Sequence, residues 1–422
     1  MKEEYLHYIF KQGFLGRNFQ TTDHKPIKVL DFGEHNPNAG PDFLDAKVEM
    51  DEKLWVGPIE FHVRADDWYK HQHQNDPEYQ NVIFHFVYEY NCPVFIGNYE
   101  IPTIELKGHI NSTHYLKYKG LFKNKGQIPC SELIESAPPL IVENQKKISL
   151  EERLWQKGIQ MISRIEQYKG DRQKAYLAAV ARVFGGAVNG LAFETLIERV
   201  HTGWLAKLNY DSFRIEALFF GLAGILDQDI KSAYGSELKE EYRYLEHLFD
   251  LEAVQKINVR YAKMRPSGFP DIRLHQFIAY LLNEYSVSRF CSEDWQISDF
   301  YTQFKPQSSL FWSKHYRLAN ESKQRHSSFL SKTQLDLILI NAVVPYLYGI
   351  GLLEGNQFYL NRSIQILTAI PPETNRFIES WERLGVKAKN ALDSQSLLAL
   401  KKAYCNRKKC LFCEIGKHVL KR

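Results

Sequence analysis

The sequence has few cysteines, no large excess of either charge, and no apolar stretch at its N-terminus like that of a signal peptide. Six cysteines in 422 residues, without a secretion signal, indicate a reducing compartment, so we expect a cytoplasmic protein. The net charge of +4 permits local contacts with nucleic acid but does not require them. The apolar run at 337–353 is interrupted by Asn341 and Pro345, which favours a buried helix over a membrane span, and no membrane partner is expected.

The composition is that of a soluble globular protein, with 44% hydrophobic and 25% charged residues. Strand patterns are concentrated before residue 107, whereas residues 147–404 show helical periodicity without a fixed repeat. We therefore predict an α+β protein with a mixed β-sheet domain at 1–146 and an all-helical domain at 147–404. A basic, cysteine-rich, metal-binding tail at 405–422 would follow them.

Two neighbouring segments, 43–50 and 54–63, carry the alternating apolar positions of β-strands. A short polar break separates them, so a hairpin is the simplest connection. If the turn is centred on this break, Asp42 faces His62 across the ladder, and Glu60 lies on the same face. The three side chains would then gather at the open end of the hairpin.

Two carboxylates and an imidazole in such a group can hold a hard metal ion and position a water molecule. Glu60 and His62 also lie inside a strongly apolar strand, where charge is costly unless it has a purpose. The alternative is an ordinary solvated hairpin face, since a one-residue shift in register would scatter the three side chains.

Other polar residues are weaker candidates for the same site. His71 and His73 follow the hairpin, and they either belong to a polar loop or close over the site as ligands or phosphate contacts. His85 lies in the next apolar strand, where a hydrogen-bonded core histidine is the simpler interpretation. Glu3 and Glu4 begin a predicted N-terminal helix, where carboxylates suit the helix dipole, although a third acidic ligand could come from there.

Two groups of basic residues could contact phosphate. Arg265 and Arg273 flank a turn rich in proline and glycine, and they are either phosphate contacts or solvated arginines of a helix connection. Basic residues of the tail could add a phosphate-facing patch, or could simply make the chain end soluble: Lys408, Lys409, Lys417, Lys421 and Arg422.

Three of the six cysteines lie close together near the C-terminus. Cys405, Cys410 and Cys413 have the spacing C-x4-C-x2-C, which places thiolates within reach of one zinc ion or one iron–sulfur cluster. A four-ligand site needs another donor, and Cys130 is the first choice, with His418 the second. The alternative is a terminal helix with three free thiols.

Several motifs resemble an uncharacterised bacterial family, a large domain of unknown function. The resemblance spans most of the chain, and it implies no activity. The motifs that carry it are GPDF at 40–43, PIEFHV at 58–63, DDW at 66–68, HQH at 71–73, RPSGFP at 265–270, NAVVP at 341–345 and the terminal YC…KKCLFCEIG.

A looser resemblance is to the PD-(D/E)XK nuclease superfamily, whose signature is a proline–aspartate, a hairpin and Glu-x-Lys. Here Pro41 and Asp42 precede the hairpin, and His62 stands where the lysine is expected after Glu60. The resemblance implies a restriction-endonuclease-like fold, with Mg²⁺ or Mn²⁺ held by the two carboxylates. His62 would position or activate water for hydrolysis of nucleic-acid phosphodiester bonds. The binding partner that this resemblance implies is nucleic acid, with DNA favoured over RNA.

The histidine in place of lysine leaves two other functions open. One is a catalytically inactive nucleic-acid-binding or scaffold protein. The other is a zinc-dependent hydrolase that uses the histidines at 62, 71, 73 and 85 with Asp42. Some exonuclease relatives of the superfamily pair one upstream cysteine with three near the C-terminus around an iron–sulfur cluster, and Cys130 with the terminal trio is similar in outline.

Overall fold

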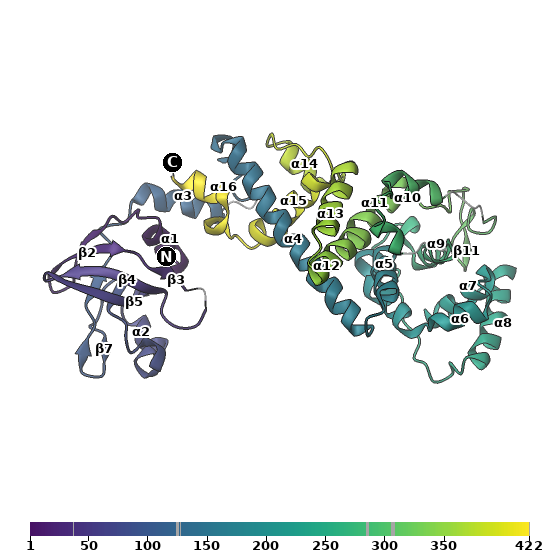
Figure 1. Ribbon diagram of the computed structural model, residues 1–422, viewed down its shortest axis with the longest axis horizontal. Helices are drawn as coiled ribbons and strands as arrows, with labels where there is room; N and C mark the ends of the chain where they lie inside the picture. The colour runs from purple at the N-terminus through teal and green to yellow at the C-terminus, as the bar shows by residue number, and fades with distance from the viewer. Residues whose placement is uncertain (37, 124–125, 127, 284–286, 305–308, 422) are drawn as a thin grey trace. The chain divides into compact units, whose positions relative to one another are not determined.

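The computed structural model describes residues 1–36, 38–123, 126, 128–283, 287–304 and 309–421 (Figure 1). The chain forms two compact units, each described by itself. The sheet unit comprises Met1–Gln145 and Lys401–Arg422, and the helical unit comprises Lys146–Leu400. The predicted α+β class, with a mixed sheet followed by a large helical region, is confirmed.

The sheet unit is built on one mixed β-sheet with the strand order β1-β2-β4-β5-β6-β9, and β3 pairs with β4 at one end of that strand. Neighbouring strands from β1 to β5 are antiparallel, whereas β6 runs parallel to β5, and β9 runs parallel to β6. The bounds are β1 Asn18–Gln20, β2 Pro26–Asp31, β3 Glu34–His35, β4 Phe43–Met50, β5 Lys53–Arg64, β6 Phe84–Glu89 and β9 Thr103–Glu105; the separate pair β7 and β8 spans Phe95–Ile96 and Tyr99–Glu100.

The helices of this unit are few and short. Helix α1 places Phe10 among the rings of Phe43, Phe61 and Phe86, with centroids 4.9–5.2 Å away, so one face of the helix is part of the core. Helices α3 and α16 lie side by side in Figure 1 and contact each other. The bounds are α1 Glu3–Lys11, α2 Asp67–Lys70, α3 Ser112–Lys123 and α16 Glu414–Lys421.

The β4–β5 hairpin forms as predicted, but its register differs from the prediction. Asp51 and Glu52 both adopt positive φ (52° and 60°), as a tight two-residue turn requires, and Met50 pairs with Lys53. A β-bulge interrupts the β4–β5 pairing at Asp45, whose φ is 55°, and the register shifts there by one residue.

This β-bulge decides which side chains meet at the open end of the hairpin. Beyond it, Phe43 pairs with Ile59, so the next residue, Asp42, reaches Glu60. The prediction that Asp42 lies opposite His62 was therefore wrong by two residues, of which the two-residue turn accounts for one and the bulge for the other. A bulge adds an extra residue to one strand, and the alternation of apolar residues does not reveal it.

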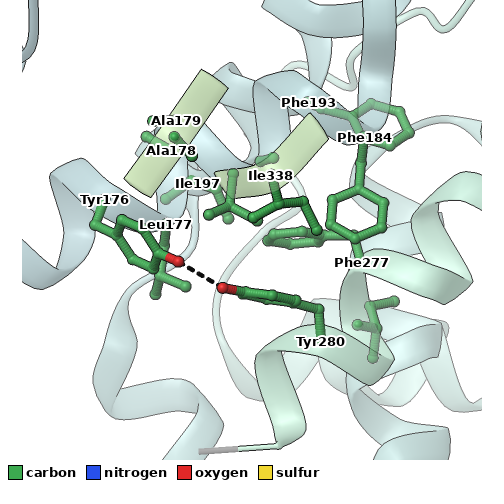
Figure 2. Close-up of a cluster of buried hydrophobic side chains, with 14 of the residues drawn as sticks. Tyr176, Leu177, Ala178, Ala179, Phe184, Phe193, Ile197, Phe277, Tyr280 and Ile338 are labelled. Carbon is green, nitrogen blue, oxygen red and sulfur yellow. Dashed lines mark hydrogen bonds between the residues drawn. The ribbon is translucent and has the colours of Figure 1, made fainter. Parts of the chain in front are cut away.

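The helical unit has an extensive apolar core. Figure 2 shows part of it, where Phe184, Phe277 and Ile338 gather and the hydroxyls of Tyr176 and Tyr280 form a hydrogen bond. Helix α4 spans Pro139–Gln167, and its residues from Lys146 onward belong to this unit. The other bounds are α5 Arg172–Arg199, α6 Thr202–Lys207, α7 Ser212–Leu222, α8 Ala233–Leu248, α9 Pro270–Leu282, α10 Ile297–Gln303, α11 Lys332–Ile338, α12 Val344–Glu354, α13 Gln357–Ala369, α14 Arg376–Glu382 and α15 Ala391–Leu400.

The helical unit departs from the predicted all-helical region in one respect. A short antiparallel hairpin, β10 His315–Arg317 and β11 Asn320–Glu321, lies within it. Two long helical stretches, Arg172–Arg199 and Lys332–Glu354, are apolar enough to cross a membrane by length and composition. Their most apolar windows are 56% and 72% buried inside the protein, and core helices of soluble proteins pass the same test.

Candidate functional site

Two carboxylates meet at the open end of the hairpin in the sheet unit. The Asp42 amide donates to Glu60 Oε2 at 3.0 Å, and the Phe61 amide donates to Asp42 Oδ2 at 2.9 Å. The Glu60 side chain is 6% exposed and that of Asp42 is 20% exposed. The side chains of Asp42 and Glu60 are thus locked together by the backbone of β4 and β5, with Glu60 on the buried side.

The close approach of these carboxylates perturbs the protonation of Glu60. Burial and the negative charge of Asp42 raise the pKa of Glu60 from its ordinary value of 4.5 to about 10. Among the described residues, no lysine or arginine forms an ion pair with Glu60. The pair therefore lacks positive charge that a bound cation could supply.

Three histidines gather beside Glu60. One ring nitrogen from each of His62, His71 and His73 lies within 4.8 Å of the others. His62 Nε2 is 3.1 Å from His71 Nδ1, and Glu60 Oε1 is 3.8 Å from His62 Nε2 and 3.6 Å from His73 Nε2. Three imidazoles and one carboxylate around a common point form a donor set that suits a transition metal ion.

The chain after β5 turns back to deliver the second and third histidines. His71 ends helix α2, and His73 begins the short 3₁₀ helix His73–Asn75. Gln72, between them, adopts the left-handed conformation with φ 63°, which reverses the chain so that both imidazoles face His62. The ring of His73 stacks on Tyr79 with centroids 3.8 Å apart, which fixes its orientation.

His85 lies behind this group and makes no direct contribution to the trio. His85 Nε2 is 2.8 Å from His62 Nδ1, so a hydrogen bond joins the two buried imidazoles across the parallel strands β5 and β6. Burial, followed by the other histidines, lowers the pKa of His62, and burial lowers the pKa of His85 to about 3. Both rings are therefore neutral at physiological pH, the form in which histidine binds metals.

Helix α1 adds two residues to the site. His7 Nε2 lies 3.1 Å from Asp42 Oδ2. Burial, and then the charge of Asp42, raise the pKa of Glu3, which places this carboxyl near the site, whereas Glu4 is exposed. The sequence predicts Glu3 only as a secondary candidate, and His7 was not predicted. The available signal was their i, i+4 spacing, which puts both on one helix face.

The remaining predicted residues lie elsewhere. Arg265 is exposed and Arg273 is half-buried, with its Nη1 3.1 Å from Gln276 Oε1, and both belong to the helical unit. Cys130, Cys405, Cys410, Cys413 and His418 belong to the sheet unit, near the chain end. Of the tail residues, Lys421 is exposed, and Arg422 lies outside the described residues.

Residues 3–376 match the model of a protein family described as a protein of unknown function, DUF2851. The chain belongs to the DUF2851 family. The resemblance to an uncharacterised family, inferred from its motifs, is thereby confirmed. Comparisons with curated proteins and with solved structures found no match. The DUF2851 match covers Glu3, the hairpin and the three histidines, but it ends before the C-terminal cysteines.

Proposed function

We propose that the sheet unit is a metal-dependent hydrolase of nucleic-acid phosphodiester bonds, with a fold of the restriction-endonuclease-like type. The observation that carries the proposal is the contact between Asp42 and Glu60, two carboxylates held together at a hairpin end without a lysine or arginine partner among the described residues. The order of Pro41, Asp42, hairpin and Glu60 is also that of the PD-(D/E)XK signature.

The donor set fits a divalent cation such as Mg²⁺ or Mn²⁺. Asp42 and Glu60 would hold it, with Glu3 placed to assist. A bound cation would polarise the phosphodiester and lower the pKa of a coordinated water. His7 Nε2, beside Asp42 and with its side chain 14% exposed, is positioned to accept or donate a proton at the site.

His62 has a different role from the lysine whose position it occupies. Its side chain is 1% exposed and its two nitrogens face His85 and His71, so it is enclosed by protein. We assign it as a metal ligand rather than as a base acting on bulk water. If His62 Nδ1 donates its hydrogen to His85 Nε2, His62 Nε2 carries the lone pair, and it is this nitrogen that lies beside His71.

The direct test is cleavage of DNA and RNA, single- and double-stranded, by the purified full chain with Mg²⁺ or Mn²⁺. We expect Asp42→Asn and Glu60→Gln to lower the cleavage rate at least about 100-fold, because each removes a ligand charge. Asp45→Asn and Glu49→Gln are matched controls, since both residues are exposed on the same hairpin. Equal rates in all five proteins would reject the assignment, and salt-sensitive binding without turnover would favour the inactive nucleic-acid-binding alternative.

A second candidate function is a hydrolase that depends on zinc or another transition metal at the histidine trio. The observation that favours it is the convergence of His62, His71 and His73 within 4.8 Å. Activity should then follow Zn²⁺ rather than Mg²⁺, and His71→Ala with His73→Ala should abolish it. His109→Ala, at an exposed histidine of the same unit, is the control. Activity that survives the double substitution would eliminate this candidate.

A further inference from the structure

Four cysteines outside the proposed active site are gathered at the end of the sheet unit. Cys130, Cys410 and Cys413 are 6–7% exposed, Cys405 is half-buried, and all four are free thiols. They come from two distant parts of the chain: Cys130 lies in Met1–Gln145, the other three lie in Lys401–Arg422, and the whole helical unit separates these segments in the sequence. The helix α16, after Cys413, contacts both the turn Cys410–Phe412 and the turn Ile134–Ser136, just beyond Cys130.

The backbone around Cys413 is arranged as in thiolate-binding loops. The amide of Cys413 donates to Cys410 O at 3.3 Å, which closes a tight turn between the two cysteines. Burial raises the pKa of the Cys413 thiol, and the backbone amides of Gly416 and Ile415, at the start of α16, act to lower it. A side chain at position 416 would place its Cβ 2.0 Å from Cys410 O, so only glycine permits this approach. Such N–H groups stabilise a thiolate more than a neutral thiol.

The four sulfurs are close enough to influence one another's ionisation. Burial, followed by Cys413 and Cys410, raises the pKa of Cys130 to about 12. Burial also raises the pKa of the Cys405 thiol, and Cys130, Cys413 and Cys410 raise it further. Each thiol of the C-terminal trio is also near a lysine: Lys401 for Cys405, Lys408 for Cys410 and Lys417 for Cys413.

We propose that Cys130, Cys405, Cys410 and Cys413 bind a thiophilic metal centre, either one zinc ion or one iron–sulfur cluster, that fastens the C-terminal segment to the sheet unit. Each thiol releases its proton to solvent when it coordinates the metal. Four thiolates around one zinc ion leave a net charge of −2 at the centre, which the neighbouring lysines help to balance. This centre stands apart from the Asp42 site, and the proposal does not depend on the nuclease assignment.

Cys130 is the fourth ligand rather than His418. The Cys130 thiol interacts with each of the three C-terminal thiols. His418 Nε2 is buried without a hydrogen-bond partner among the described residues, which makes it the alternative donor that the variants below must separate from Cys130. A site with His418 instead of Cys130 would use residues 405–418 alone and would not link the two parts of the chain.

The test measures metal in the full chain purified without oxygen, with His71→Ala and His73→Ala in every protein compared so that the histidine site holds no metal. We expect one zinc per chain, or iron with acid-labile sulfide and the visible absorption of a cluster. Cys410→Ser and Cys413→Ser should lower that content to below about a tenth of the wild-type level. Cys92→Ser, at a half-buried cysteine of the same unit, should retain it. Equal loss in Cys130→Ser and full retention in His418→Gln would assign the fourth ligand.

A second measurement needs no variant. Cobalt(II) added to the metal-free wild-type chain should produce intense thiolate-to-cobalt charge-transfer bands, which a site made of histidine and carboxylate cannot give. This signal separates the cysteine centre from any metal at His62, His71 and His73. The proposal is overturned if cobalt gives no such bands and reconstitution with zinc, or with iron and sulfide, leaves the chain empty. It is also overturned if the Cys410 and Cys413 variants retain the wild-type metal.

Discussion

A buried carboxylate is paired with arginines in the helical unit but lies beside a second carboxylate in the sheet unit. In the helical unit, Glu194 is 8% exposed and lies between two arginines, with Arg164 on one oxygen and Arg182 on the other. In the sheet unit, Glu60 is 5% exposed and faces a second carboxylate and neutral histidines. The first arrangement balances its own charge, whereas the second leaves negative charge and metal-binding nitrogens around a common point.

Two other buried acids of the helical unit, Glu216 and Asp271, accept hydrogen bonds from neutral donors on both oxygens. Both oxygens of Glu216 are engaged, because the Trp312 indole donates to one at 2.7 Å and the Tyr234 hydroxyl donates to the other at 3.0 Å. Asp271 accepts from the Tyr261 hydroxyl and from the Leu318 amide. Burial of an acid therefore does not mark a site in this protein. What distinguishes Glu60 is the second carboxylate, Asp42, beside it, together with an oxygen that faces two histidine nitrogens at 3.6 and 3.8 Å.

The largest expected effect on stability is at Glu194. Glu194→Gln removes the charge that pairs with Arg164 and Arg182, and we expect a loss of about 3 kcal/mol in the free energy of unfolding. Denaturant titration measures it, with Glu198→Gln, at an exposed position of the same helix, as the control. If Glu194→Gln lowered the free energy of unfolding no more than Glu198→Gln does, the claim that the helical unit balances the charge of its buried carboxylate would be wrong.

The next effect concerns His85, which orients His62 without belonging to the trio. His85→Leu removes the partner of His62 Nδ1, and we expect metal affinity at the histidines to fall by about 10- to 100-fold. His85→Gln keeps a polar group there and should restore part of the affinity. Calorimetric titration with Zn²⁺ measures both, in a chain whose four clustered cysteines are replaced. Unchanged affinity in His85→Leu would show that the hydrogen bond does not orient a ligand.

A smaller and opposite effect on stability is expected at Glu60 in the metal-free protein. The folded state holds the Glu60 proton more tightly than the unfolded chain, so this group reduces stability progressively as pH rises from 4.5 toward about 10. Glu60→Gln should remove this pH dependence and stabilise the metal-free protein at pH 8 by at least about 1 kcal/mol. Thermal unfolding in chelator across this pH range checks the sign, and destabilisation at pH 8 would contradict it.

The smallest effect is expected in the core of the helical unit. Tyr176→Phe removes the hydroxyl that pairs with Tyr280, without creating a cavity. We expect a loss of about 1 kcal/mol by denaturant titration and no change in metal binding at the sheet unit. Altered metal binding would mean that the two units are energetically coupled.

The sequence predicts the elements of this fold better than their register. The periodicity of 43–50 and 54–63 predicted the hairpin correctly, because alternation follows from burial of one sheet face. The bulge at Asp45 could not be predicted, since aspartate tolerates many turn conformations and its left-handed φ depends on the surrounding strands. The bulge accounts for one residue of the change in the partner of Asp42 from His62 to Glu60, and the two-residue turn, shorter than the predicted one, accounts for the other.

The site was predictable to the extent that its residues lie on regular elements. Glu60 and His62 share a face because they are two residues apart on β5. His71 and His73 join them through a left-handed Gln72, which has no strong sequence signal. His7 approaches Asp42 only because α1 packs on the sheet, a tertiary contact that local patterns do not contain.

The central claim is that Asp42, Glu60 and the histidines beside them form a metal site. Its most direct test is the titration of metal-free protein, with the four clustered cysteines replaced, with Mn²⁺, followed by electron paramagnetic resonance of the free ion. The wild-type site should remove Mn²⁺ from solution in a stoichiometric step, Glu60→Gln should not, and Glu49→Gln should behave as the wild type. Equal binding by Glu60→Gln and the wild-type site, or no binding by either, would contradict the claim.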